Sequence, residues 1–492
     1  MQRMKFAAVA VACAVTCAPV AGAHGVRAQV VAEDQDIYAE VVAMLEREAA
    51  GQLTRHLQKS GRLRQISVSI RLDMSSRSMT INFGPGYLPG PEGSYDELFL
   101  QPMASSLRFF AEKSGLEVND INFLFEGKAL ENYYPEDLAV PVRNAQRSAP
   151  SSALVSSSHG YISLHPGREW KFQRPAPLGL QEDTLSPVYG DELQALIEQR
   201  SGLAVHRARS RSTEQHPESN LPWEHMSSRY HLKALFPERT DMWNEFPNST
   251  ESEREKDEDI RARPNYANHL GVDVLISLHS NGHDSAAIRG TEVYYHHTKA
   301  QDKPLADSII CSMREIIRAQ PGYEEFPVRE GSNQGNHGEN RIGKMPSVIV
   351  ETAYHSNPED VVALQDPVFR SASMKGVEKG YRLWATGKTC EPLALQSMPD
   401  IEVPVQSSRE VMVNFSGNPQ YPLDLEVAMA ECDRPGFCTP WVQRFEVPGE
   451  PVKYQASCSS SRPGQVVWKV MLRDADGVKT PPVEFTQACV KA

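Results

Sequence analysis

From residue 153 to residue 389 the chain alternates strand-like and helix-like segments, and this alternation limits the possible folds more than any other feature. Runs of β-branched and aliphatic residues predict strands at 152–160, 203–210, 272–281 and 347–354. Helical periodicity predicts helices at 183–202, 264–270, 304–320 and 374–387. Such alternation is typical of a parallel sheet, because each helix carries the chain back across the sheet. We therefore expect an α/β domain at 151–389, with a mostly parallel sheet covered by helices on both faces.

One segment inside this domain, 210–259, does not follow the alternation. It contains four prolines and ends in the charge run ESEREKDED. A stretch of this length without regular structure is uncommon in a compact domain unless it has a function. We interpret it as an insertion that borders the functional site, and a solvated excursion without a role is the alternative.

Smaller units are predicted on either side of the α/β domain. A helix at 36–57, a hairpin at 65–84, a helix at 94–115 and a strand at 121–127 indicate a small α/β domain at 29–150, whose role the sequence does not reveal. Short alternating segments separated by Gly, Pro and Asn turns predict an immunoglobulin-like β-sandwich at 395–492. Such a module usually binds a partner or serves as a spacer. The flanking domains are therefore candidate contact surfaces for a protein partner.

The first 28 residues predict a cleaved secretory signal. The basic leader MQRMK precedes an uncharged apolar run, and small-residue sites end at Ala23 and Ala28. This run is at the short end for a membrane span of about 20 residues, so we expect an exported protein, periplasmic or secreted, without a transmembrane anchor. A lipid anchor at Cys13 is a weaker alternative. Removing the signal takes away three basic residues and lowers the formal charge from −12 to −15, which disfavours nucleic acid and anionic membranes as partners.

The cysteines also fit an exported protein. Of eight cysteines two leave with the signal, and five of the remaining six lie after residue 389. An oxidising compartment favours disulfides among them. Cys432 and Cys438 flank a short loop, and Cys458 with Cys489 could clamp a terminal strand, although the sequence leaves the pairing open. Cys311 lies in a helical pattern, and we expect it to be a buried thiol.

Three of the predicted strands end on residues that suit a metal site. The first leads to His159, the strand 272–281 to His279, and the strand 347–354 to Glu351. In an open α/β sheet, ligands gather at the carboxyl ends of the strands. A single histidine at a strand end is more often a surface or hydrogen-bonded residue than a ligand, but the joint placement of these three residues indicates a site.

A catalytic zinc site needs three His or carboxylate ligands and one open position. His159 and His279 supply two ligands, and Glu182, immediately before a helix, is the best candidate for the third. Asp183 is its nearest rival, although Asp183 or Thr184 is better placed as the helix cap. An acidic residue at this place can also simply favour the helix dipole.

These motifs resemble the zinc-dependent N-acetylmuramoyl-L-alanine amidases of bacterial cell-wall remodelling. The resemblance rests on SSSHG with the following GLQED, on NHLGVDVLISLHSNG, and on MPSVIVETAYHSN, which occur in the family's order. It implies that His159, Glu182 and His279 bind Zn²⁺ and that Glu351 is catalytic. One departure is that the family more often opens with Asp-x-Gly-His-Gly, so the SSSHG of this chain leaves the role of a supporting acidic residue unfilled.

The resemblance also implies a reaction and a substrate. The expected enzyme is a peptidoglycan hydrolase that cleaves the amide bond between N-acetylmuramic acid and the L-alanine of the stem peptide, using water activated by zinc. Glu351 would take a proton from this water and return one to the leaving amine.

Basic residues close to these motifs are candidates for substrate binding. Arg168, Lys171 and Arg174 follow His159, and they could bind the carboxylates of the stem peptide by charge-assisted hydrogen bonds. Solvated surface charges are the alternative. Asn281 and Arg263 are candidates for holding the ligands in place or contacting the substrate.

Other interpretations stay open at this point. His355 and His165 are rival ligands, and either in place of Glu182 would make a site of three histidines. A zinc carboxypeptidase-like peptidase would use the same residue types, but its first two ligands normally lie a few residues apart, whereas His159 and Glu182 are 23 positions apart. A non-catalytic wall-binding scaffold without zinc is the third interpretation, and the presence of all four polar residues speaks against it.

Overall fold

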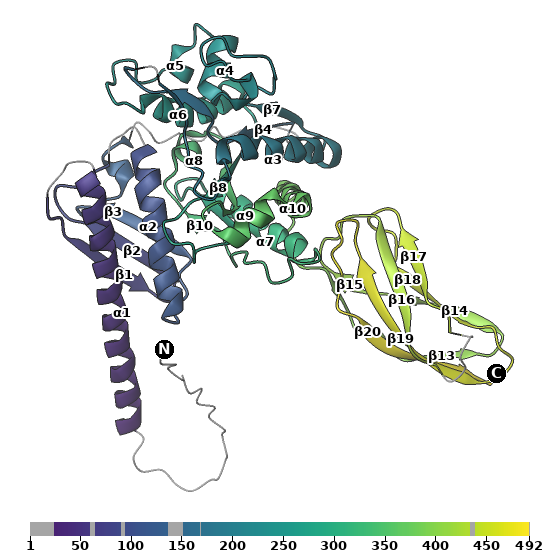
Figure 1. Cartoon of the computed structure of the whole chain (residues 1–492). Coiled ribbons are helices and arrows are strands. Elements are labelled where there is room, and N and C mark those ends of the chain that lie inside the picture. Colours follow the sequence, from purple (N-terminus) through teal and green to yellow (C-terminus); the bar gives the residue numbers. More distant parts are fainter. Residues whose placement is uncertain are drawn as a thin grey trace.

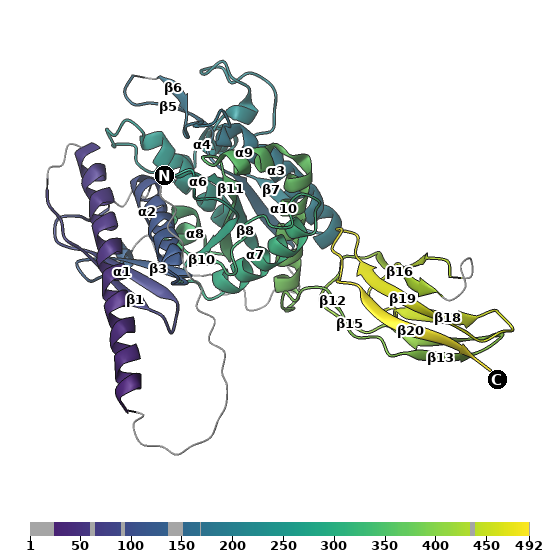
Figure 2. The same cartoon turned by 60° about the horizontal axis from the view of Figure 1, so that its bottom comes forward.

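The computed structural model describes residues 24–59, 64–89, 94–135, 151–167, 169–432 and 438–491. Three parts follow one another in space, with the N-terminal domain at one end, the α/β domain in the centre and a strand-rich C-terminal domain at the other end (Figures 1 and 2). Residues 1–23 of the predicted signal lie outside the described residues. No described helix has both the length and the apolar character that a bilayer span requires.

The N-terminal domain packs two helices against a small sheet. Helices α1 (His24–Lys59) and α2 (Ser94–Lys113) accompany the strands β1 (Val68–Asp73), β2 (Ser78–Phe83) and β3 (Asp120–Phe125). β1 and β2 form the predicted hairpin, and β3 pairs with β2 in parallel. Apolar residues of both helices, among them Leu53 and Leu107, pack on Ile81 and Phe83 of the sheet. The predicted helix, hairpin, helix and strand are therefore confirmed.

The central domain contains a mixed sheet of six strands in the order β10-β9-β11-β8-β4-β7. Its strands are β4 (Ser152–Ser157), β7 (Ala204–Arg207), β8 (Val274–Asn281), β9 (Glu292–Tyr295), β10 (Asn333–Gln334) and β11 (Ser347–Tyr354). The four predicted strands are present and parallel. β9 and β10 were not predicted, and β9 runs antiparallel to β11. β10 pairs with β9 in parallel, so two strands, β9 and β10, run opposite to the four predicted strands, and β9 lies beside β11.

Helices cover both faces of this sheet, as expected. Side chains on β4 alternate between the faces, so that Val155 packs in one apolar cluster and Leu154 in another. One face is covered by α3 (Glu182–Leu196), α7 (Asp302–Arg318) and α10 (Pro367–Ala385), and the other by α4 (Ser228–Leu235), α5 (Thr240–Trp243) and α6 (Arg254–Leu270). Two short helices, α8 (Gly338–Ile342) and α9 (Pro358–Gln365), flank β11.

The segment 210–259 has more regular structure than its prolines indicate. It contains η4 (Trp223–His225), α4, α5 and the beginning of α6. The second half of its charge run, 256–259, is buried, and Glu258 and Asp259 are fully buried, whereas Glu251 and Ser252 at its start are exposed. Arg229, itself buried, pairs with Glu258 at 2.7 Å and with Glu255 at 2.9 Å. These ion pairs replace water around the carboxylates, which explains how a charged sequence forms an inner helix.

The C-terminal domain is built from short antiparallel strands with one parallel pair. A five-stranded sheet has the order β13-β20-β19-β16-β17, and a two-stranded sheet pairs β14 with β18. The strands are β13 (Ile401–Pro404), β14 (Ser407–Met412), β16 (Leu423–Cys432), β17 (Trp441–Phe445), β18 (Lys453–Cys458), β19 (Gly464–Arg473) and β20 (Val483–Val490). A small pair, β12 (Ala394–Leu395) with β15 (Phe415–Ser416), lies in the connection. The strand-rich domain agrees with the sequence, and its immunoglobulin-like type stays a prediction.

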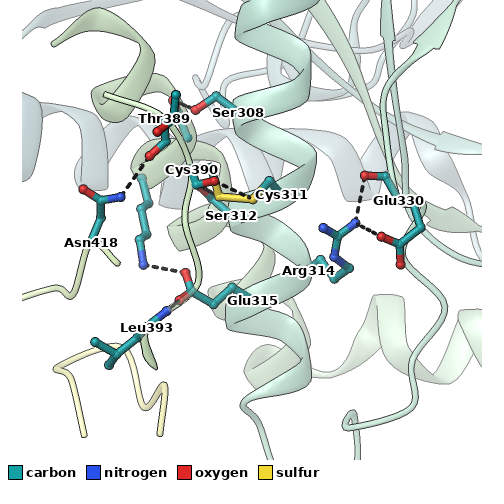
Figure 3. Close-up of a disulfide and its surroundings, with 12 residues drawn as sticks. Ser308, Cys311, Ser312, Arg314, Glu315, Glu330, Thr389, Cys390, Leu393 and Asn418 are labelled. Carbon is teal, nitrogen blue, oxygen red and sulfur yellow. Dashed lines mark hydrogen bonds and ion pairs between the residues drawn. A yellow bond between two sulfur atoms is a disulfide. The ribbon is translucent and has the colours of Figure 1, made fainter. Parts of the chain in front are cut away.

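Disulfides link Cys432 with Cys438 and Cys458 with Cys489, two pairs that the sequence suggested while leaving the pairing open. The expectation that Cys311 is a free thiol is wrong, because Cys311 on α7 is bonded to Cys390 (Figure 3). Beside this bond, Glu315 of α7 accepts a hydrogen bond from the backbone N–H of Leu393 at 2.9 Å. The segment after α10 is thus fixed to the central domain before the chain enters the C-terminal strands.

The contact between α7 and α10 depends on small residues. A Cβ atom at Gly380 would lie 2.4 Å from Cα of Ile309, and the Gly380 carbonyl accepts a hydrogen bond from Ser308 at 2.7 Å. We predict that Gly380→Ala forces the helices apart and lowers the free energy of unfolding by about 1–3 kcal/mol. Chemical denaturation followed by circular dichroism measures this loss.

Gly51→Ala is the matched control, because a Cβ atom in this position on α1 would come no closer than 3.5 Å to its nearest neighbour. Alanine is the better helix former, so this variant is expected to be as stable as the parent or slightly more stable. Equal stability of Gly380→Ala and Gly51→Ala would contradict the close approach of α7 and α10.

Candidate active site

Four side chains that come from distant parts of the sequence meet at the carboxyl edge of the central sheet. His159 follows β4, Glu182 begins α3, and His279 and Glu351 lie on the neighbouring strands β8 and β11, where they are register partners. His159, Glu182 and Glu351 are buried, and His279 keeps 9% of its side chain exposed. The structure thus brings together all four residues that the motifs indicate.

The two histidines and Glu182 have the spacing of metal ligands. Oε1 of Glu182 lies 3.4 Å from Nε2 of His159 and 3.4 Å from Nδ1 of His279. One ligand atom from each residue lies within 4.8 Å of the others. Ligand atoms at about 2.0–2.1 Å from zinc in a tetrahedral site are separated by about 3.3 Å. The donor set and its spacing therefore fit a zinc ion with three protein ligands.

A second carboxylate, Glu339 on α8, orients His279. Its Oε2 atom lies 2.8 Å from Nε2 of His279, and Arg263 donates a hydrogen bond to its Oε1 atom. Because the Nε2–H donates to Glu339, the Nδ1 atom is left to face Glu182. The predicted residue Arg263 is fully buried and acts on His279 through Glu339. Glu339 was missed by the sequence analysis, since a five-residue helix inside a long connection gives no periodic signal.

His159 is held in a different way. Its Nδ1 atom is buried and has no hydrogen-bond partner among the described residues. This agrees with the sequence SSSHG, which lacks the acidic residue of the family's opening motif. Asp183 instead fixes the loop, because its Oδ1 atom accepts hydrogen bonds from the backbone N–H groups of Gly160 at 2.8 Å and Gln173 at 3.0 Å. The expectation that Asp183 or Thr184 caps the helix is wrong, because α3 already begins at Glu182.

Glu351 has the properties of a residue that transfers protons. Gln101 of α2 donates a hydrogen bond to its Oε1 atom at 3.1 Å, whereas Oε2 has no hydrogen-bond partner in the part of the chain that the structure describes. Burial raises the pKa of Glu351 to about 7, against the opposing effect of His279. A carboxyl group with a pKa near neutrality can both accept and return a proton.

These residues open into one cavity of about 650 Å³ between the central and N-terminal domains. The central domain contributes the four site residues, Arg174 and His355, and the N-terminal domain contributes a wall that includes Arg55, His56, Phe99, Gln101, Phe109 and Phe110. Within the described chain, no residue of the segment 210–259 lines this cavity. The N-terminal domain, for which the sequence indicated no role, thus forms part of the site.

The remaining predicted residues lie in different surroundings. Arg174 lines the cavity, and its Nη1 atom has no hydrogen-bond partner among the described residues. Asn281 also lines the cavity, and it donates a hydrogen bond to Glu292 at 3.3 Å. Lys171 pairs with Glu253 and is not part of the described cavity lining. Arg168 lies outside the described residues.

Neither rival histidine takes the place of Glu182. Nδ1 of His355 lies 3.9 Å from Oε2 of Glu182 and 3.0 Å from the hydroxyl of Ser280, so His355 borders the cluster. His165 is in the loop after β5 (Tyr161–Ser163), and it is absent from the cavity lining that the structure describes. The cluster therefore consists of two histidines and one carboxylate.

The fold and the site define an α/β domain with a cluster of two histidines and one carboxylate that could hold a metal ion, next to a buried glutamate. Residues 248–381 match a family model described as N-acetylmuramoyl-L-alanine amidase. The resemblance indicated by the motifs is thereby confirmed for this segment. The matched segment contains His279 and Glu351. His159 and Glu182 precede this segment in the sequence, and the fold places them beside the other two residues.

Individual relatives agree with the family match. N-acetylmuramoyl-L-alanine amidase LytC of Bacillus subtilis is 29% identical over 123 residues, which are 25% of this chain and 23% of LytC. The probable cell wall amidase LytH of Staphylococcus aureus is 25% identical over 112 residues, 23% of this chain and 35% of LytH. The matched part thus spans 23% and 35% of the length of these two relatives. Among solved structures, the amidase AmiC2 of Nostoc punctiforme is 18% identical, covering 48% of this chain and 97% of that chain with a TM-score of 0.32.

The contact between Glu339 and His279 leads to a prediction about metal affinity. Glu339→Gln keeps the size of the side chain but removes the negative charge that fixes the imidazole ring, so zinc affinity is expected to fall about 10–100-fold. Competition with a chromogenic chelator measures this change. Glu330→Gln, at an exposed residue that pairs with Arg314, removes one negative charge elsewhere and should leave the affinity unchanged. Equal affinities of the two variants would show that Glu339 does not orient the ligand.

Proposed function

We propose that this protein is a zinc-dependent peptidoglycan hydrolase, an N-acetylmuramoyl-L-alanine amidase that cleaves the bond between N-acetylmuramic acid and the L-alanine of the stem peptide. One observation carries the proposal. The His159–Glu182–His279 cluster and the partly unpaired carboxyl group of Glu351 open into the same cavity, and two of these four residues lie in the segment that matches the amidase family.

The chemistry divides between the metal and Glu351. Zinc held by two neutral imidazoles and one carboxylate would polarise the amide carbonyl and lower the pKa of water from about 15.7 towards 7. Glu351 accepts the proton of the attacking water on Oε2, the oxygen without a partner, while Gln101 holds Oε1. The same carboxyl group then passes a proton to the departing amine of L-alanine, so one residue serves both steps.

Charged groups along the cavity support a peptide substrate with free carboxylates. Arg174 lines the cavity, and its buried Nη1 atom has no hydrogen-bond partner among the described residues, so this guanidinium is proposed to bind a carboxylate of the stem peptide. Arg55 and His56 of the N-terminal domain also line the cavity. Asn281 is positioned by Glu292 and is proposed to contact substrate from β8.

The cellular location of the enzyme and the role of its C-terminal domain are also part of the proposal. We propose export to the periplasm or the cell exterior, which the three disulfides support because such bonds persist in oxidising compartments. The C-terminal domain is proposed to be an immunoglobulin-like sandwich that spaces the enzyme or binds the wall or a protein partner.

Replacement of Glu351 tests the reaction. Glu351→Gln removes the proton acceptor and is expected to reduce the rate about 10²–10⁴-fold while the zinc content stays at the parent level. Mass spectrometry of digested peptidoglycan sacculi measures the release of stem peptides that begin with free L-alanine. Glu359→Gln, on the exposed side of α9, is the matched control and should retain activity.

The product distinguishes the alternatives. Release of terminal amino acids in place of whole stem peptides would identify a peptidase, and absence of any product from zinc-loaded parent protein would favour a scaffold. Equal rates for Glu351→Gln and the parent would remove Glu351 from its proposed role.

A further inference from the structure

A second cluster of metal-competent side chains lies where the N-terminal domain meets the central domain. Glu131 is in the short helix η1 (Leu130–Asn132) of the N-terminal domain, and His296 and His297 follow β9 directly. Oε1 of Glu131 lies 3.5 Å from Nε2 of His296 and 3.8 Å from Nε2 of His297. We propose that these three residues bind a second divalent metal ion of the zinc type, which connects the two domains.

The hydrogen bonds of the two rings decide which nitrogen of each histidine is available to a metal. Nδ1 of His296 lies 2.7 Å from the hydroxyl of Thr298, and Nδ1 of His297 lies 3.3 Å from the side-chain amide of Gln334. The Thr298 hydroxyl can accept the Nδ1–H of His296, which leaves Nε2 of His296 for a metal. The amide nitrogen of Gln334 donates to Nδ1 of His297, so binding of a metal at Nε2 of His297 requires the Gln334 amide to turn its oxygen towards the ring. Ligating histidines usually donate their other ring N–H to an acceptor, and the contact of His296 with Thr298 has this arrangement.

A fourth donor lies beside the cluster. Oδ1 of Asn336 is 3.3 Å from Nε2 of His296, and it also accepts a hydrogen bond from Arg341 at 2.7 Å. The bond from Arg341 keeps the amide oxygen, not the amide nitrogen, directed towards the cluster. Two imidazole nitrogens with carboxylate and amide oxygens are a donor set that zinc and similar divalent ions accept.

The cluster combines a protected interior with an access route. His296 is completely buried and only 10% of the Glu131 side chain is exposed, whereas 41% of His297 is exposed. The cluster therefore has a rigid inner ligand and an outer ligand that an entering ion can reach. Glu131 and His297 also line a cavity of about 280 Å³.

The domains are already aligned at this point by a neighbouring contact. Tyr295, which immediately precedes the two histidines, donates a hydrogen bond to Asp120 of β3 at 2.9 Å. An ion held by Glu131 from one domain and two histidines from the other would strengthen this alignment. It would also hold in place the domain whose Gln101 contacts Glu351.

Zinc stoichiometry of the full chain tests the proposal. Protein stripped with a chelator and dialysed against zinc chloride is expected to retain two zinc ions per chain, measured by atomic emission after removal of free metal. His297→Ala and Glu131→Gln should each retain one. His279→Ala should also retain one, at the second cluster. His206→Ala, on the edge strand β7 and outside both clusters, is the matched control and should retain two.

The outcomes separate this proposal from the proposed enzyme function. Equal zinc content of the parent, His297→Ala and Glu131→Gln would overturn the second site, as would a folded His279→Ala protein without zinc. If the protein showed no amidase activity in any assay, the zinc content expected for the second cluster would be unaffected, because none of the ligands of the second cluster belongs to the first. In His279→Ala, zinc should raise the melting temperature, and the double variant His279→Ala/His297→Ala should not respond.

Discussion

The buried carboxylate of Glu182 is the group on which the rest of the site depends. It lies against His159 and His279 and has no Arg or Lys partner among the described residues. A buried negative charge without compensation is costly. Burial alone would lower the pKa of His279, but Glu339 and Glu182 outweigh this effect and raise its pKa to about 10. A proton on His279 thus supplies positive charge that a divalent cation would otherwise provide, and binding of the cation would release it.

A buried carboxylate also needs a partner of opposite charge at the boundary between the central and N-terminal domains. Arg108 of α2 is buried and lies 3.5 Å from Glu292 on β9, and Tyr354 on β11 donates a hydrogen bond to Ser105 of α2 at 3.2 Å. Separating the domains would leave Glu292 without its guanidinium partner, which is strongly destabilising for a buried charge. The N-terminal domain is therefore a structural part of the active-site cavity and not a tethered accessory.

The sequence could predict those parts of the structure that local patterns encode. The alternation of strands and helices indicated the parallel order, and the positions of His159, His279 and Glu351 at or near the carboxyl ends of three predicted strands indicated the shared edge, since carboxyl ends of parallel strands meet. The contribution of Glu339 could not be predicted, because it depends on how the connection between β10 and β11 folds back. The bond of Cys311 to Cys390 and the reversed direction of β9 likewise depend on long-range packing, for which periodicity gives no signal.

The two histidines of the cluster show two physical solutions to the same problem. His279 is oriented by a carboxylate, Glu339, at 2.8 Å. His159 has no such partner and is oriented by its backbone, which adopts a positive φ of 61° before Gly160, where a Cβ atom would lie 2.7 Å from the backbone of Ser227. Asp183 locks this loop through hydrogen bonds to its amides. The acidic residue that SSSHG lacks is thus replaced in its positioning role by a conformationally constrained loop, whereas no group among the described residues replaces its hydrogen bond to the ring.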